Sequence, residues 1–137
     1  MKFPADIPVY GDQSFRGKCP AETLEQVTFF NRIRREHPDM WGLLALHPRN
    51  EGRRTSYEVM RDKAEGMTTG ACDIVIPGAP AFVCELKRRD HTQSTIHKKQ
   101  VAYLEAASRA GCFTCIALGV DAAWEAFNEY LARRSQA

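Results

Sequence analysis

The segment Ala-Phe-Val-Cys-Glu-Leu-Lys at residues 81–87 decides the fold that we expect for this chain. Its β-branched and aromatic residues predict a strand, and the segment Cys-Asp-Ile-Val-Ile at residues 72–76 predicts a second, shorter one. The residues between them, Pro77-Gly78-Ala79-Pro80, are typical of a turn. The two strands are therefore predicted to form a β-hairpin.

The hairpin carries three charged residues in otherwise apolar strands. Side chains alternate between the two faces of a strand, so Glu85 and Lys87 share one face with Val83, while the residues at even positions share the other. In the first strand Asp73 interrupts an apolar run, and the turn places it across from Glu85. Buried charges are costly unless they are paired or used. We therefore expect Asp73, Glu85 and Lys87 to converge at one end of the hairpin.

Two carboxylates beside a lysine suit the hydrolysis of a phosphodiester. Asp73 and Glu85, with the backbone carbonyl of Leu86, can hold a hard cation such as Mg²⁺ through oxygen ligands. Such a cation lowers the pKa of bound water and neutralises charge on the phosphate. Lys87 can orient or help deprotonate the attacking water and stabilise the transition state. The other interpretation of these residues is a structural ion pair at the end of a sheet.

The segments around the hairpin predict helices and further strands. Apolar periodicity and end signals predict three helices, at residues 20–36, 96–110 and 121–133, the last capped by Asp121. The short apolar runs at residues 41–46 and 112–118 are candidate strands. Residues 50–70 are expected to form a loop with one helical turn near residues 57–63.

The predicted order of elements indicates an α/β sandwich around a mixed sheet. Strand 81–87, helix 96–110 and strand 112–118 would form a parallel, right-handed βαβ unit after the hairpin. The length of 137 residues fits one domain, which we place at residues 19–137, after an extended N-terminal arm at residues 1–18.

Composition excludes several classes of protein. No apolar run approaches the roughly 20 residues that cross a bilayer, and residues 1–10 do not form a secretory signal, so we expect a cytoplasmic protein. The five cysteines are odd in number, and the pair Cys112 and Cys115 lies in a strand-like run, so neither a disulfide framework nor a zinc site is expected. The formal net charge of +2 is too small to identify a partner.

The ordered set of motifs resembles the VRR-NUC (virus-type replication–repair nuclease) family of the PD-(D/E)-x-K nuclease superfamily. The resemblance covers about residues 21–131. Its elements are an acidic first helix at residues 22–26, the stretch from His47 to Arg54, Gly70 before Asp73, the segment at residues 82–87, and Gln100. The family typically has Pro-Asp where this chain has Cys72-Asp73. Many members are phage-encoded, which implies a bacterial or infected host cell.

The resemblance implies a restriction-endonuclease-like fold and a DNA endonuclease that depends on Mg²⁺ or Mn²⁺. It makes Asp73, Glu85 and the Leu86 carbonyl metal ligands, and it makes Lys87 the catalytic lysine. A glutamate of the first helix would be a further ligand or would anchor a water molecule.

Glu22 and Glu25 are both candidates for that glutamate. Glu22 is favoured, because it shares a helical stripe with Gln26, Phe29 and Ile33 that faces the sheet, and Glu25 lies off the edge of that stripe. An ordinary acidic residue in the first turn of a helix is the other interpretation of either residue.

Gln100 lies in the stripe of the helix at residues 96–110 that also holds Ile96, Tyr103, Leu104 and Ala107. A lone amide in an apolar stripe needs a hydrogen-bond partner. The resemblance places this glutamine beside the metal site.

The expected partner is DNA, and stand-alone members of this length resemble resolvases that cut four-way junctions as homodimers. Polar and basic residues outside the catalytic cluster are expected to contact the DNA: His47, Asn50, Arg53, Arg54, Arg88, Arg89, Lys98 and Lys99. We expect no small-molecule cofactor and no membrane partner. The alternatives are an inactive nucleic-acid-binding module with a nuclease-like fold, and an α/β protein in which the acid–lysine pair is structural.

Overall fold

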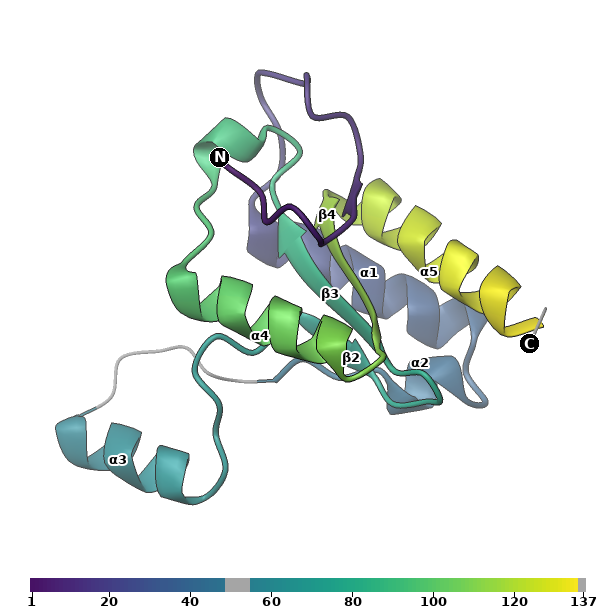
Figure 1. Ribbon diagram of the computed structural model, residues 1–137. Coiled ribbons are helices and arrows are strands. Elements are labelled where there is room, and N and C mark those ends of the chain that lie inside the picture. Colours follow the sequence, from purple (N-terminus) through teal and green to yellow (C-terminus); the bar gives the residue numbers. More distant parts are fainter. Residues whose placement is uncertain (49–54, 136–137) are drawn as a thin grey trace.

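The computed structural model describes residues 1–48 and 55–135, and it contains a mixed four-stranded sheet with helices on both faces (Figure 1). The strands are β1 (Val9–Tyr10), β2 (Ile74–Ile76), β3 (Phe82–Lys87) and β4 (Phe113–Leu118). The helices are α1 (Glu22–Glu36), α2 (Trp41–Leu44), α3 (Ser56–Ala64), α4 (Lys98–Arg109) and α5 (Val120–Ser135), with a 3-10 turn at His91–Gln93. The predicted α/β class with a mixed sheet is confirmed.

The strands lie in the order β1-β4-β3-β2. β2 pairs antiparallel with β3, with Val75 opposite Val83, and β3 pairs parallel with β4, with Glu85 opposite Ile116. β3 is therefore a central strand, and all of its residues are buried. α4 connects β3 to β4 and covers one face of the sheet (Figure 1).

The N-terminal arm adds a strand that the sequence did not predict. β1 pairs parallel with β4 at the edge of the sheet, with Val9 opposite Ile116. Ile7, just before it, is only 4% exposed and joins the core under α4. The arm thus packs along the same sheet that carries the hairpin.

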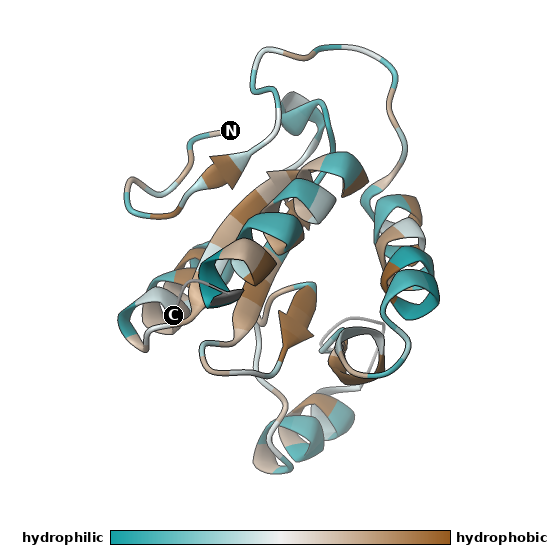
Figure 2. Cartoon of the chain, turned by 90° about the vertical axis from the view of Figure 1, so that its right-hand side faces the viewer, coloured by the Kyte–Doolittle hydropathy of each residue, from teal (hydrophilic) through white to brown (hydrophobic). Residues whose placement is uncertain are grey.

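Two hydrophobic cores lie on opposite faces of the sheet. In Figure 2 the strands are mostly hydrophobic, whereas each helix has both hydrophobic and hydrophilic residues. The larger core joins α1 and α5 to the sheet and is rich in aromatic rings, with Phe29, Phe82, Phe127 and Tyr130 almost fully buried. The smaller core lies under α4 and contains Ile7, Cys72, Val83, Leu104, Ile116 and Leu118.

Residues 41–46, a candidate strand by sequence, are not a strand: they begin with the single helical turn α2, and only Leu46 pairs, as an isolated bridge to Val75. The cause is close packing on the end of α1. The N–H of Gly42 donates to the His37 carbonyl across 2.7 Å. A Cβ at Gly42 would lie 2.6 Å from the Ile33 carbonyl oxygen, so a residue without a side chain is required.

α3 is longer than the single turn that was predicted near residues 57–63. Its first turn is capped by the Thr55 side chain, which accepts a hydrogen bond from the N–H of Glu58. No residue of α3 is buried, and the helix stands away from the sheet and the other helices (Figure 1). No helix within the described residues is long and apolar enough to span a membrane.

Candidate active site

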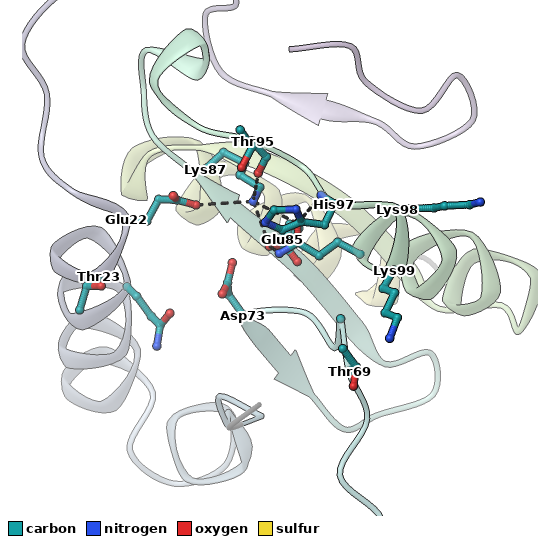
Figure 3. Close-up of a pocket in the computed structure, with 13 residues that line it drawn as sticks. Glu22, Thr23, Thr69, Asp73, Glu85, Lys87, Thr95, His97, Lys98 and Lys99 are labelled. Carbon is teal, nitrogen blue, oxygen red and sulfur yellow. Dashed lines mark hydrogen bonds and ion pairs between the residues drawn. The ribbon is translucent and has the colours of Figure 1, made fainter. Parts of the chain in front are cut away.

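A pocket of about 720 Å³ opens at the carboxyl end of β3, between the first turns of α1 and α4 (Figure 3). The structure brings most of the predicted catalytic and metal-binding residues into this pocket. Those whose side chains line it are Glu22, Asp73, Glu85, Lys87 and Gln100. Lys98 and Lys99, two of the predicted DNA contacts, also line it.

Asp73 lies just before β2 and is tied to the neighbouring strand. Its Oδ2 accepts a hydrogen bond of 2.8 Å from the backbone N–H of Leu86. The N–H and C=O of one strand residue point to the same side, so the Leu86 carbonyl also lies on the side of β3 that faces Asp73. The carbonyl of the next residue, Lys87, points the other way and accepts from Gly119 after β4. The Leu86 carbonyl thus lies on the same side of β3 as the Asp73 carboxylate.

Glu85 is 1% exposed and presents its carboxylate to the floor of the pocket. Its Oε1 accepts from Gln100 Nε2 across 3.2 Å and lies 3.5 Å from Lys87 Nζ. Within the described residues, its buried Oε2 has no hydrogen-bond partner. Burial and, next, the negative charge of Asp73 raise the pKa of Glu85 to about 9, although Lys87 opposes the shift.

Lys87 is 3% exposed, and its ammonium group is held on several sides. Nζ donates to the Thr95 carbonyl across 2.7 Å and to Gln100 Oε1 across 3.4 Å. It also forms an ion pair with Glu22, drawn as a dashed line in Figure 3, in which Nζ lies 3.7 Å from Oε1. Because the loop after β3 folds back to bring Thr95 to this amine, the lysine has a fixed position at the wall of the pocket.

The two glutamates of α1 have different surroundings. The side chain of Glu22 is 40% exposed and faces Lys87, and partial burial raises its pKa despite that lysine. Glu25 is 4% exposed, and its Oε2 accepts a hydrogen bond from the N–H of Val120. Glu25 therefore caps α5 at Val120, whereas the sequence predicted that Asp121 would cap this helix. Of the two glutamates, Glu22 is the one that lines the pocket.

Gln100 links α4 to the side chains of Glu85 and Lys87. Its Nε2 donates to Glu85, and its Oε1 accepts from Lys87 and from the backbone N–H of His97, the latter across 2.8 Å. The lone amide of the α4 stripe thus has partners on the strand and at the start of its own helix. These contacts fix the side chains of Glu85 and Lys87 relative to each other.

Carboxyl groups outnumber ammonium groups in the inner pocket. The three carboxylates of Glu22, Asp73 and Glu85 face the single ammonium of Lys87. The unpartnered Oε2 of Glu85 and the repulsion between Glu85 and Asp73 are features that a bound cation would relieve. In the described part of the chain, no group of three or more His, Cys, Asp and Glu side chains is arranged to hold a metal ion. The donor set that fits a hard cation is therefore two carboxylates supplemented by a backbone carbonyl.

The predicted DNA-binding residues are dispersed. Lys98 and Lys99 are exposed at the rim of the pocket. Arg88 donates to the carbonyl of Cys19, the residue after the N-terminal arm, across 2.8 Å, and the guanidinium of Arg89 lies 4.4 Å from the centre of the Phe15 ring within the arm. His47 lies outside the pocket and bonds to the Asp73 carbonyl. Asn50, Arg53 and Arg54 lie outside the described residues.

The sequence missed several residues that shape the pocket. Thr95 acts through its backbone carbonyl, which no side-chain pattern reveals. Gly70 was noted in the sequence only as the glycine before Asp73; it has a φ of +85°, and a Cβ there would lie 2.7 Å from the backbone of Lys99, so this glycine lets the chain approach α4 closely. His97 also lines the pocket, and its position before a helix gave no signal of this.

Comparison with known proteins supports the fold. No known protein family matches the sequence, and no curated protein matches it either. A solved structure described as a VRR_NUC domain protein is similar, with a TM-score of 0.64 and 19% sequence identity. The similarity covers 86% of this chain and 92% of that chain. At this identity the likeness concerns the fold, and it agrees with the nuclease-like fold expected from the motifs.

Proposed function

We propose that this chain is a divalent-metal-dependent endonuclease that hydrolyses phosphodiester bonds in DNA. The observation that carries the proposal is the cluster of half-buried Asp73 with buried Glu85 and Lys87 in one pocket, with an oxygen of Glu85 that has no partner within the described residues. The fold shared with a VRR_NUC domain protein supports it. Lysines at the rim of the pocket suit a substrate that carries phosphates.

Asp73, Glu85 and the Leu86 carbonyl are the groups that would hold Mg²⁺ or Mn²⁺. When bound, such an ion acts as a Lewis acid and lowers the pKa of coordinated water. Two carboxylates match these ions, because Mg²⁺ keeps several water molecules and uses few protein ligands. Glu22 lies at the mouth of the pocket, where it can be a further ligand or anchor a water molecule.

Lys87 would supply the positive charge that the reacting phosphate needs. Its amine is already held by the Thr95 carbonyl and Gln100, so little reorganisation is required when charge develops on the phosphate oxygens. The same amine can orient the attacking water molecule. Gln100 is a positioning residue, because it contacts Lys87 and Glu85.

We further propose that the protein prefers branched DNA and works as a homodimer. Symmetric cutting of two strands needs two active sites, and a two-fold dimer provides them. Exposed apolar side chains on α2 and α3 are candidates for the interface: Leu43 is 76% exposed, Tyr57 65% and Met60 63%. Light scattering of the wild type and of Tyr57→Asp tests this, since a dimer through α3 predicts a monomeric variant and a monomeric wild type contradicts it.

A cleavage panel tests the activity. Duplex plasmid, single-stranded, flap and four-way DNA are incubated with Mg²⁺, with Mn²⁺ and with EDTA, using the wild type and Lys87→Ala. We expect cleavage by the wild type with a divalent ion and none by the variant. Equal cleavage by both proteins would overturn the mechanism. Binding without any cleavage would favour the inactive module, and no binding would favour a structural acid–lysine pair.

A further inference from the structure

A second hollow, of about 260 Å³, lies beside the catalytic pocket along α1. Gln26 lines both the hollow and the pocket, so the two are neighbours. The other walls are Val27, Phe30, Asn31 and Arg34 of α1 and His47. The proposed catalytic role uses none of these side chains.

His47 connects the hollow to the catalytic aspartate. Its Nδ1 lies 2.8 Å from the backbone carbonyl of Asp73. A carbonyl can only accept, so Nδ1 carries the hydrogen, and in the neutral imidazole Nε2 is then an acceptor. His47 therefore offers a hydrogen-bonding edge at a position fixed relative to Asp73.

The remaining walls combine apolar, planar and amide groups. Val27 is 49% exposed and supplies apolar surface, whereas Phe30 is 7% exposed and has the Arg34 guanidinium 5.3 Å from the centre of its ring. The amides of Gln26 and Asn31 also line the hollow, and each carries hydrogen-bond donors and an acceptor that suit the polar edge of a ligand.

These walls match a nucleobase better than a phosphate. A nucleobase is flat and polar only at its edge, and proteins bind it by stacking on aromatic or guanidinium planes and by hydrogen bonds to that edge. A phosphate site would concentrate cations and N–H donors, whereas Arg34 is the one permanently charged side chain among the six residues of the described segments that line this hollow.

We infer that the hollow binds an unpaired nucleobase from a nucleotide adjacent to the scissile phosphate. A base that enters this hollow has left the stack of the duplex, so it cannot be paired at the same time. The substrate class is therefore DNA with at least one unpaired nucleotide next to the cut, such as a flap or a branch point. This inference rests on the proposed nuclease function, because it takes the catalytic pocket as the place of the scissile phosphate.

Fluorescence of 2-aminopurine tests the inference without cleavage. Flap DNA carries the probe at one position at a time around the cut, and the protein is added in EDTA. A base that leaves its stacked neighbours changes its fluorescence, so we expect a large change at one unpaired position and small changes elsewhere. A uniform response along the strand would overturn the inference.

Three variants of α1 locate the binding site. Asn31→Trp fills the hollow from an exposed helical position and should abolish the position-specific signal. Arg34→Gln should weaken the signal, whereas Arg35→Gln removes the same charge from a neighbouring side chain that is 70% exposed and should leave it unchanged. Equal effects of the two arginine variants would indicate general electrostatics and contradict a base-binding hollow.

Kinetics with abasic DNA separate this inference from the proposed function. An abasic site at the responsive position keeps the phosphate and should lower kcat/KM roughly tenfold, the effect of losing one stacked base. An abasic site three nucleotides away is the control. If cleavage depends on the metal but is unaffected by the abasic site, the base-binding inference is overturned and the proposed nuclease function stands. A position-specific signal without cleavage overturns the nuclease and keeps the base-binding hollow, and failure to bind any DNA overturns both.

Discussion

Asp73 and Leu86 are joined by a hydrogen bond of 2.8 Å from the backbone N–H of Leu86 to the carboxylate. Asp73 directly precedes Ile74, the first residue of β2. Its side chain therefore adds one hydrogen bond to β3 after the backbone pairing of the two strands has ended. The acid is thereby fixed beside the strand that carries Glu85 and Lys87.

Two substitutions of Asp73 separate this structural bond from the charge. Asp73→Asn keeps an oxygen that can accept from Leu86, so stability should change little, while cleavage should fall by about 10²-fold or more because the charge is lost. Asp73→Ala should lose cleavage and also about 1 kcal/mol of unfolding free energy. Urea unfolding and cleavage rates measure both. Full cleavage by Asp73→Asn would show that the carboxylate charge is not required.

Divalent ions should stabilise the wild type against heat. An ion that binds the folded state adds about 2.7 kcal/mol when its concentration is 100 times its Kd, so Tm should rise with Mg²⁺ or Mn²⁺ relative to EDTA. Glu85→Gln should lose this rise. Glu105→Gln, an exposed acid on α4, is the matched control and should keep it. The same rise in both variants would mean that the ion binds elsewhere.

The glutamates of α1 should give opposite phenotypes. Glu22→Ala should impair cleavage and change stability by less than about 0.5 kcal/mol, because Glu22 is half-exposed. Glu25→Ala should cost about 1–3 kcal/mol, because it leaves the N–H of Val120 without its partner. Unfolding curves and rates per folded molecule distinguish the two. A stable, inactive Glu25→Ala protein would reverse the assignment.

Lys87 and Lys98 should affect different kinetic constants. Lys87→Met keeps an apolar stem and removes the amine, so kcat should fall by about 10²–10³-fold. Lys98→Met removes one charge at the rim, so KM should rise and the salt dependence of binding should weaken by about one unit of slope. Steady-state kinetics at several salt concentrations measure both. A pure KM effect at Lys87 would contradict a role in the chemical step.

Asp90 should make stability sensitive to acid. Hydrogen bonds, first from the Thr92 hydroxyl and next from the Gly17 N–H, lower the pKa of Asp90 to about 2 from 3.8. A carboxyl group with a lowered pKa stabilises the fold fully above its unfolded pKa of 3.8, and the contribution disappears as the pH falls through about 2.

The measurement is Tm as a function of pH for the wild type and Asp90→Asn. The variant should be less stable at neutral pH and should lose less stability between pH 4 and 2. Asp39→Asn, an exposed residue, is the control for the loss of a charge. Parallel curves for the wild type and Asp90→Asn would show that these hydrogen bonds contribute nothing to acid sensitivity.

The sequence predicted the parts of the fold that depend on local pattern. The alternation along residues 82–87 predicted that Glu85 and Lys87 share a face, and the structure places both in one pocket. The apolar stripe of α1 predicted that Glu22 would point toward the sheet, and Glu22 lies 3.7 Å from Lys87.

Tertiary contacts explain what the sequence did not predict. Residues 41–46 form a helical turn because Gly42 packs on the end of α1, a contact over five to nine residues that the apolar pattern of this segment does not reveal. Glu25 caps a helix 95 positions further along the chain, where a cap from Asp121 was expected. β1 exists because β4 leaves an edge open to the arm, and the sequence of Val9 and Tyr10 alone is too short to indicate a strand.

The two hydrophobic cores differ in size, and this difference determines which part of the protein unfolds locally at the lowest cost. The aromatic core under α1 and α5 is extensive, whereas α4, which carries Gln100, rests on the small core around Leu104. Local opening costs least where few apolar contacts are broken, so amide hydrogens of α4 should exchange with solvent before those of α5. The protein can therefore loosen one wall of its pocket, to admit or release a bulky polymer, while the opposite layer stays folded.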